Sequence, residues 1–256
     1  MESQLSSPSD LKLAEGAFRF VPSRNGGLEM WREPVEGELY VAGIDTSAGG
    51  AHSDLCSLSM VETRSRCLVA AWNGLYDPTM WGKMCARIGA YYNNAMLAFE
   101  THPSQHGLSA CLAARDAGYG NIYRRQQQGM VTLRMTEELG WATTYKTKPL
   151  MIDRVRIALR EKYEIPSEAL LKQLLRAKLA AKTGEAEQVE FEGKDDFFTS
   201  YAIAQVVADI VGAQGYLTRG EEKPKSWHDQ WWAHRKAQAE KTMTRSGPRQ
   251  RLYDGA

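Results

Sequence analysis

Short apolar and alternating runs, separated by turns with Gly, Ser or Arg, follow residue 38. Three such runs occupy residues 38–47, 53–62 and 66–74. Their pattern is typical of an antiparallel three-strand meander. After the meander, the periodicity predicts a helix at about 77–92, a strand at 95–100 and a helix at about 104–117 closed by Gly118. This succession of strands and helices indicates an α/β fold.

The second half of the chain is mainly amphipathic. Helices are predicted from about 149, at about 167–181 and from Asp195 to about 212, with a strand at 187–192. Residues 1–37 mix turn formers with isolated apolar positions, and the sequence beyond Gly215 is polar and basic. We therefore expect three parts, namely a lead-in segment (1–37), one domain (38–215) and a basic, Trp-rich tail (216–256).

The net charge of +1 is unevenly distributed. Residues 1–121 contain nine Lys/Arg against thirteen Asp/Glu, whereas residues 122–182 contain thirteen against six. A basic region of this kind fits a phosphate-facing surface, although charged solvated helix faces are the commoner cause of such a pattern. The four scattered cysteines are expected to be reduced core residues. No apolar run reaches about 18 residues and the start is polar, so we expect a cytoplasmic protein that does not enter a membrane.

Carboxylates stand where apolar strands end. Asp45 follows the apolar residues 40–44, where an ionised group is costly to desolvate without a partner, although Asp also favours turns. Glu100 ends a second apolar run and is no turn former. Asp195 and Asp196 open the last long helix, and capping explains one of them more readily than both.

Convergence of these carboxylates depends on the fold. If the strands of Asp45 and Glu100 are neighbours and the last helix starts beside them, their oxygens suit Mg²⁺ or Mn²⁺. Two ions about 3.5–4 Å apart can activate a water and stabilise the departing oxygen in phosphodiester hydrolysis. The sequence therefore predicts a two-metal site.

The order of these elements and acidic residues resembles that of the ribonuclease-H-like superfamily. This superfamily also includes resolvases and transposases. Four segments together resemble the nuclease domain of tailed-phage large terminase subunits and span roughly residues 36–212: YVAGIDTSAGGAHSD, LAFETHPSQHGLSACLAARDAGYGNIYRR, GWATTYKTKPLMID and GKDDFFTSYAIA. The resemblance implies a mixed sheet, with the meander joined by parallel strands and flanked by helices. It also implies an endonuclease that cuts double-stranded DNA during genome packaging.

Residue by residue, the resemblance assigns metal binding to Asp45, Glu100, Asp195 and Asp196. It implies that Lys146 or Lys148 faces the DNA backbone. Where the family often has a His, this chain has Lys194, which we expect to contact phosphate.

The implied partners are those of a packaging motor. No GxxxxGK[ST] phosphate loop occurs in the sequence, so the packaging ATPase is expected on another domain or chain. A small terminase subunit and the portal or procapsid are further implied partners. In the tail, Trp227, Trp231 and His234 have the spacing of one helix face, which either packs on the core or docks to the portal.

Two other functions are compatible with the sequence. A non-catalytic DNA-binding or docking module would use the acidic residues as caps. An actin-like or sugar-kinase fold would use GIDTSAGG as a phosphate loop, but it needs a second Gly-rich hairpin, and Asp116-Ala117-Gly118 lies at a predicted helix end.

Overall fold

The three runs that follow residue 38 fold as the expected antiparallel meander. β5 (Tyr40–Asp45) pairs with β6 (Cys56–Glu62), and β6 pairs with β7 (Leu68–Gly74). This computed structural model describes residues 3–5, 13–14, 17–18, 27–49, 54–128, 135–180, 188–191 and 195–217. All of them belong to the unit Met1–Arg219, and the Trp-rich part of the tail lies outside the described residues.

Parallel strands extend the sheet on the β5 side. β8 (Met96–His102) runs parallel to β5, and β11 (Trp141–Ala142) runs parallel to β8. On the other side, β4 (Leu28–Met30) pairs with β7 and β1 (Ser3–Leu5) pairs with β4. The strand order is β1-β4-β7-β6-β5-β8-β11. The predicted mixed sheet is thus confirmed, and the lead-in segment contributes β1 and β4 to its edge.

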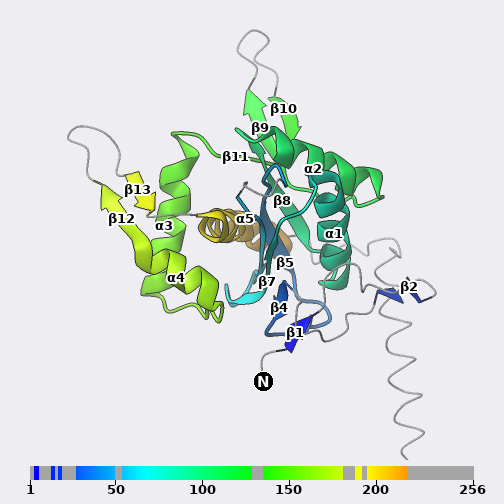
Figure 1. Cartoon of the computed structure of the whole chain (residues 1–256), viewed down its shortest axis with the longest axis horizontal. Coiled ribbons are helices and arrows are strands. Elements are labelled where there is room, and N and C mark those ends of the chain that lie inside the picture. The colour runs from blue at the N-terminus through cyan, green and yellow to red at the C-terminus, as the bar shows by residue number, and fades with distance from the viewer. Residues whose placement is uncertain are drawn as a thin grey trace, which may run out of the picture. The chain divides into compact units, whose positions relative to one another are not determined.

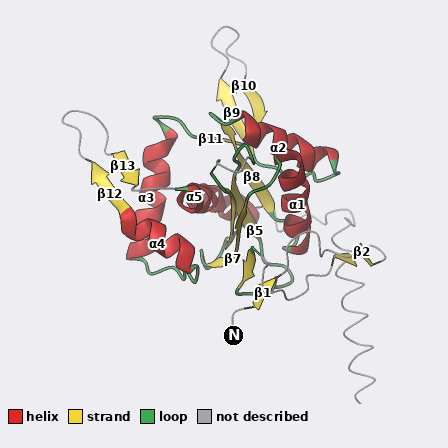
Figure 2. Cartoon of the chain, viewed as in Figure 1, coloured by secondary structure: helices red, strands yellow, loops and turns green. Residues whose placement is uncertain are grey.

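Helices cover both faces of this sheet (Figures 1 and 2). α1 (Pro78–Tyr91) and α2 (Gln105–Asp116) lie on one face, and α3 (Thr147–Arg160), α4 (Glu168–Arg176) and α5 (Asp196–Leu217) lie on the other. The first two helices begin where the sequence supplies caps. The Asp77 carboxylate accepts from the first turn of α1, and the Ser104 hydroxyl accepts from Gly107 N in α2.

One local prediction was wrong, and some elements were not predicted. The helix expected to reach residue 181 ends at Arg176, because the chain continues as β12 (Ala177–Ala180), which pairs with β13 (Gln188–Phe191). Pairing with a partner strand here outweighs helix propensity. Two further pairs, β9 (Arg124–Gln128) with β10 (Met135–Leu139) and β2 (Leu13–Ala14) with β3 (Ala17–Phe18), were not predicted.

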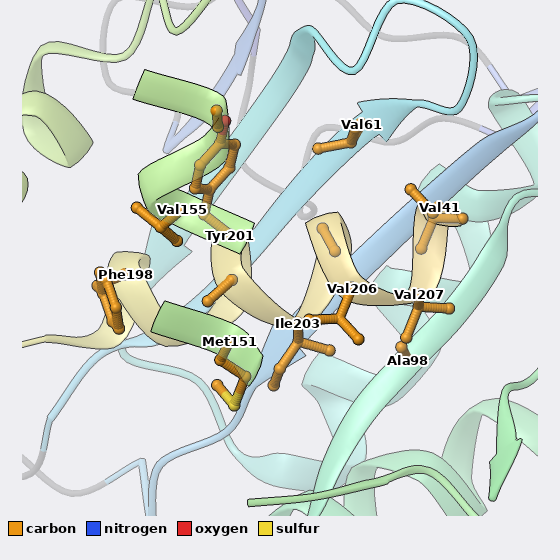
Figure 3. Close-up of a cluster of buried hydrophobic side chains, with 14 of the residues drawn as sticks. Val41, Val61, Ala98, Met151, Val155, Phe198, Tyr201, Ile203, Val206 and Val207 are labelled. Carbon is orange, nitrogen blue, oxygen red and sulfur yellow. The ribbon is translucent and has the colours of Figure 1, made fainter. Parts of the chain in front are cut away.

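Helix α5 forms the centre of one core layer. Its Ile203, Val206 and Val207 pack among Val41, Val61 and Ala98 of the sheet and Met151 and Val155 of α3 (Figure 3). Burying an aliphatic side chain of this size contributes about 1.5–3 kcal/mol. The position of α5 is therefore fixed by the core.

The sheet is lined with small residues beneath the start of α5. Gly43 pairs with Ser59 on β6 and with Ala98 on β8. A Cβ atom at Gly43 would lie 1.9 Å from the backbone oxygen of Ser200 in α5. The hydroxyls of Ser59 and Ser200 are 2.9 Å apart and form a hydrogen bond. Small side chains thus allow the helix backbone to rest directly on β5.

We expect Gly43→Ala to lower the free energy of unfolding by about 1–3 kcal/mol, because backbone atoms of α5 must move to admit the methyl group. Urea unfolding of both proteins measures the change. Gly120→Ala is the matched control, since no heavy atom lies within 4 Å of a Cβ placed there. Equal stabilities of the two variants would contradict the close contact between α5 and β5.

The four cysteines are free. Cys56, Cys85 and Cys111 are buried, as predicted for core residues, whereas Cys67 is half-buried. Burial raises the pKa of the Cys111 thiol to about 11, so this thiol is protonated at neutral pH. Within the described part of the chain, no helix has the length and apolar character needed to cross a membrane.

Candidate metal centre

Two predicted carboxylates lie side by side at the end of the sheet. Parallel pairing of β5 with β8 sets Ile44 beside Phe99, so the next residues, Asp45 and Glu100, are neighbours. Side chains alternate along a strand, so Asp45 shares the face of Gly43, which α5 covers. The charge of Glu100 raises the pKa of Asp45, as expected for neighbouring carboxylates. Glu100 is only 8% exposed, whereas Asp45 is less completely buried as a residue.

The acidic pair opens α5 at the same place. The backbone oxygen of Asp195 accepts the first helical hydrogen bond, from Thr199 N at 2.9 Å. Asp196 is 6% exposed. Its Oδ2 accepts from Leu55 N at 3.2 Å, and its backbone oxygen accepts from the Ser57 hydroxyl at 2.6 Å. The start of β6 therefore fixes both the backbone and one carboxylate oxygen of Asp196.

Charges within this cluster are crowded. Burial raises the pKa of Asp45 well above its ordinary 3.8, and the charges of Glu100 and Asp196 raise it further. Burial also raises the pKa of Glu100 from 4.5, with a further contribution from the charge of Asp195. The charge of Asp196 thus contributes to the shift of Asp45, and that of Asp195 to the shift of Glu100. Crowded carboxylates of this kind favour the binding of a proton or a cation.

Only part of this set is already assembled. Within the described ranges, no three His, Cys, Asp or Glu side chains converge closely enough to form a ready metal-binding group. Instead, the Asp45–Glu100 pair forms the centre, with the two helix aspartates near enough for their charges to act on it. Mutual repulsion among carboxylates opposes closer approach unless a cation is bound.

The expected DNA-facing lysines differ in position. The charge of Lys148, in the first turn of α3, lowers the pKa of Glu100. Lys146 precedes the helix, and its Nζ lies 5.6 Å from the ring centre of Tyr145. Lys194 lies outside the described residues.

Three residues at the site were not identified from the sequence. The side chain of Thr143 lowers the pKa of Glu100, while Leu55 N and the Ser57 hydroxyl donate hydrogen bonds to Asp196. Thr143 follows β11, a strand of two residues that is too short to show a period. The alternating serines Ser57 and Ser59 in an otherwise apolar strand were an available signal that this face meets something polar.

No family model and no curated protein matches the sequence. Solved structures do match. The large terminase nuclease of thermophilic phage G20c with bound cobalt aligns with a TM-score of 0.56 at 12% identity, over 72% of this chain and 89% of that chain. The same nuclease with bound magnesium gives 0.55 at 13% identity, with the same coverage.

A third structure agrees with these two. The Thermus phage P74-26 large terminase nuclease domain aligns with a TM-score of 0.51 at 14% identity, over 71% of this chain and 86% of that chain. The matches cover most of each nuclease domain as well as most of this chain. This chain therefore has the ribonuclease-H-like fold of the phage large terminase nuclease domains.

Proposed function

We propose that this chain is a metal-dependent endonuclease that hydrolyses phosphodiester bonds of double-stranded DNA during phage genome packaging. One observation supports this above all. Carboxylates from β5, β8 and the start of α5 gather at one end of a sheet that has the terminase nuclease fold.

The donor set fits hard divalent cations. It consists of carboxylate oxygens, which Mg²⁺ and Mn²⁺ prefer, and the described structure sets one lysine charge, that of Lys148, against Glu100. The matching nucleases were solved with bound magnesium, cobalt and zinc. We therefore propose Mg²⁺ or Mn²⁺ as the natural cofactor, with two ions per site.

Asp45, Glu100, Asp195 and Asp196 would together supply the carboxylate oxygens that hold the ions. Bound ions supply an activated water, orientation of the scissile phosphate and stabilisation of the departing oxygen. The backbone N–H groups at the start of α5 also favour negative charge at this end of the helix.

DNA and packaging partners complete the proposal. Lys148, whose charge acts on Glu100, Lys146 at the start of α3 and Lys194 before α5 would neutralise backbone phosphates without reading sequence. The packaging ATPase, the small terminase subunit and the portal or procapsid are the proposed protein partners. Docking through Trp227 and Trp231 remains a prediction for the tail.

Plasmid cutting tests this function. Supercoiled plasmid should become nicked and then linear with Mn²⁺ or Mg²⁺ present, and it should stay supercoiled with EDTA. Protein carrying Asp45→Asn, purified in the same way, controls for contaminating nuclease. Plasmid that is bound but never cut with either metal would instead support a non-catalytic DNA-binding or docking module.

A further inference from the structure

Tyr145 is an aromatic residue that the fold leaves mainly in solvent. It is 81% exposed, whereas every other aromatic residue whose exposure the structure describes is buried or half-buried. Aromatic rings bury about 150–250 Å² each when they join a core. The Tyr145 ring gives up this contribution to folding, so its surroundings decide what it can bind.

Tyr145 lies just beyond the end of the sheet that carries the acidic cluster. β11 runs parallel to β8, and its Trp141 is in register with Glu100. The N–H of Thr143 donates to His102 O at 2.8 Å, which continues this pairing past the strand. Consecutive Cα atoms are about 3.8 Å apart, so the Cα atom of Tyr145 is at most about 7.6 Å from that of Thr143. The ring therefore belongs to the same end of the sheet as the proposed metal centre.

The backbone on both sides of Tyr145 is held by hydrogen bonds. Thr144 N donates to the Thr147 hydroxyl at 2.8 Å, and Thr147 N donates to the Thr144 hydroxyl at 3.3 Å. The Thr147 hydroxyl donates in turn to Ala142 O at 2.7 Å, which joins the start of α3 to β11. Reciprocal bonds of this kind fix the direction in which a chain enters a helix. The turn is thus already ordered, which lowers the entropic cost of binding a ligand there.

Positive charges flank the ring. Lys146 Nζ lies 5.6 Å from the ring centre of Tyr145, within the range of a cation–π contact. Lys146 and Lys148 are both exposed, and residues 141–152 contain no Asp or Glu. The ammonium group approaches one face of the ring and leaves a second face. A ligand with negative charges and flat rings matches this surface, and DNA offers both in its phosphates and bases.

The state of the DNA decides whether its bases can reach such a ring. In an intact duplex each base is stacked between its neighbours, and extracting one costs free energy. An unpaired base at a DNA end or in an opened stretch has a free face. Stacking on an aromatic side chain then needs only that face and hardly depends on which base it is. The ring is therefore suited to unpaired bases rather than to closed duplex.

We propose that Tyr145 is a stacking platform for an unpaired nucleobase of the DNA held at the metal centre, with Lys146 neutralising a neighbouring phosphate. This inference rests on the proposed nuclease function and adds to it a preference for DNA that has unpaired bases beside the cutting site.

Binding of fluorescein-labelled DNA to the full chain tests the proposal. Anisotropy in EDTA gives Kd for a blunt duplex and for the same duplex with a single-stranded overhang, over a series of salt concentrations. Tyr145→Ala removes the ring, and Tyr145→Phe keeps the ring without its hydroxyl. Val35→Ala is the matched control, because Val35 is an exposed apolar residue before β5, at the end opposite Asp45. A 2-aminopurine base in the overhang reports stacking through loss of its fluorescence.

We expect Tyr145→Ala to weaken binding of the overhang duplex by about 5–150-fold and to affect the blunt duplex much less. Tyr145→Phe and Val35→Ala should bind like the wild type. The salt dependence should be unchanged in Tyr145→Ala and lower in Lys146→Ala, since only the lysine contacts phosphate. The 2-aminopurine signal should be quenched by the wild type and not by Tyr145→Ala.

Three outcomes would overturn the inference. Equal Kd values of wild type and Tyr145→Ala for the overhang duplex, with plasmid cutting intact, would leave the nuclease function standing and assign Tyr145 to a protein partner. Equal weakening by Tyr145→Phe and Tyr145→Ala would show that the hydroxyl acts and not the ring. A wild type that neither binds DNA nor cuts plasmid would overturn both proposals together.

Discussion

Asp45→Asn is expected to abolish DNA cleavage while leaving DNA affinity nearly unchanged. The substitution keeps the shape of the side chain and removes the charge that Glu100 and Asp196 crowd. Loss of a metal ligand removes several kcal/mol of stabilisation of the transition state, which corresponds to a rate about a thousandfold lower or more. Plasmid cutting in Mn²⁺ measures the rate, and a filter or mobility assay in EDTA measures the affinity.

Asp116→Asn is the matched control for this experiment. It makes the same chemical change at an exposed carboxylate at the end of α2, where Asp116 pairs with Arg115. Cutting at the wild-type rate is expected. A comparable rate in Asp45→Asn would exclude Asp45 from the mechanism.

The metal-free protein is expected to lose stability as pH rises, and bound Mn²⁺ should offset the loss. The folded-state pKa of Asp45 lies well above its ordinary 3.8, chiefly through burial and then through neighbouring charges. Between these two values the folded chain holds a proton that the unfolded chain has released, so stability falls with increasing pH. Below pH 3.8, the full contribution of Asp45 to the free energy of unfolding is present.

The contribution of Asp45 is the difference between wild type and Asp45→Asn in urea unfolding at a series of pH values. Without metal, the wild type should lose stability relative to the variant as pH rises through this window. With Mn²⁺ at about 100 times its dissociation constant, wild type should gain about 2.7 kcal/mol and the variant much less. If the metal-free wild type instead became more stable relative to the variant as pH rises, Asp45 would be favourably paired with a positive charge rather than crowded by negative charges.

The sequence pattern was sufficient to predict which carboxylates meet at the site, but not which other residues surround them. Parallel neighbours end at the same edge of a sheet, so Asp45 and Glu100 were expected to meet once their strands were placed next to each other. Thr143 could not be expected in the same way, because its location depends on β11, where two residues pair with β8. Short strands are fixed by their partners and leave no period in the sequence.

Helix geometry explains why two alternatives stayed open. Successive residues in a helix point about 100° apart, so Lys146 and Lys148 at the start of α3 differ by about 200° and cannot both face Glu100. Of these two lysines, Lys148 is the one whose charge lowers the pKa of Glu100. By the same reasoning Asp195 and Asp196 diverge, and they act on different carboxylates, Glu100 and Asp45 respectively.

The seating of α5 on Gly43 has a mechanical consequence. Helix α5 both fills the core, through Ile203 and its neighbours, and carries the acidic pair at its N-terminal end. Sliding the helix along its axis by one turn would move this end by about 5.4 Å and shift its core side chains out of their present contacts. Retracting the aspartates is therefore no practical way to switch the site off. In the proposed nuclease, control of cutting would therefore act outside this helix, through the entry of DNA or the supply of cations.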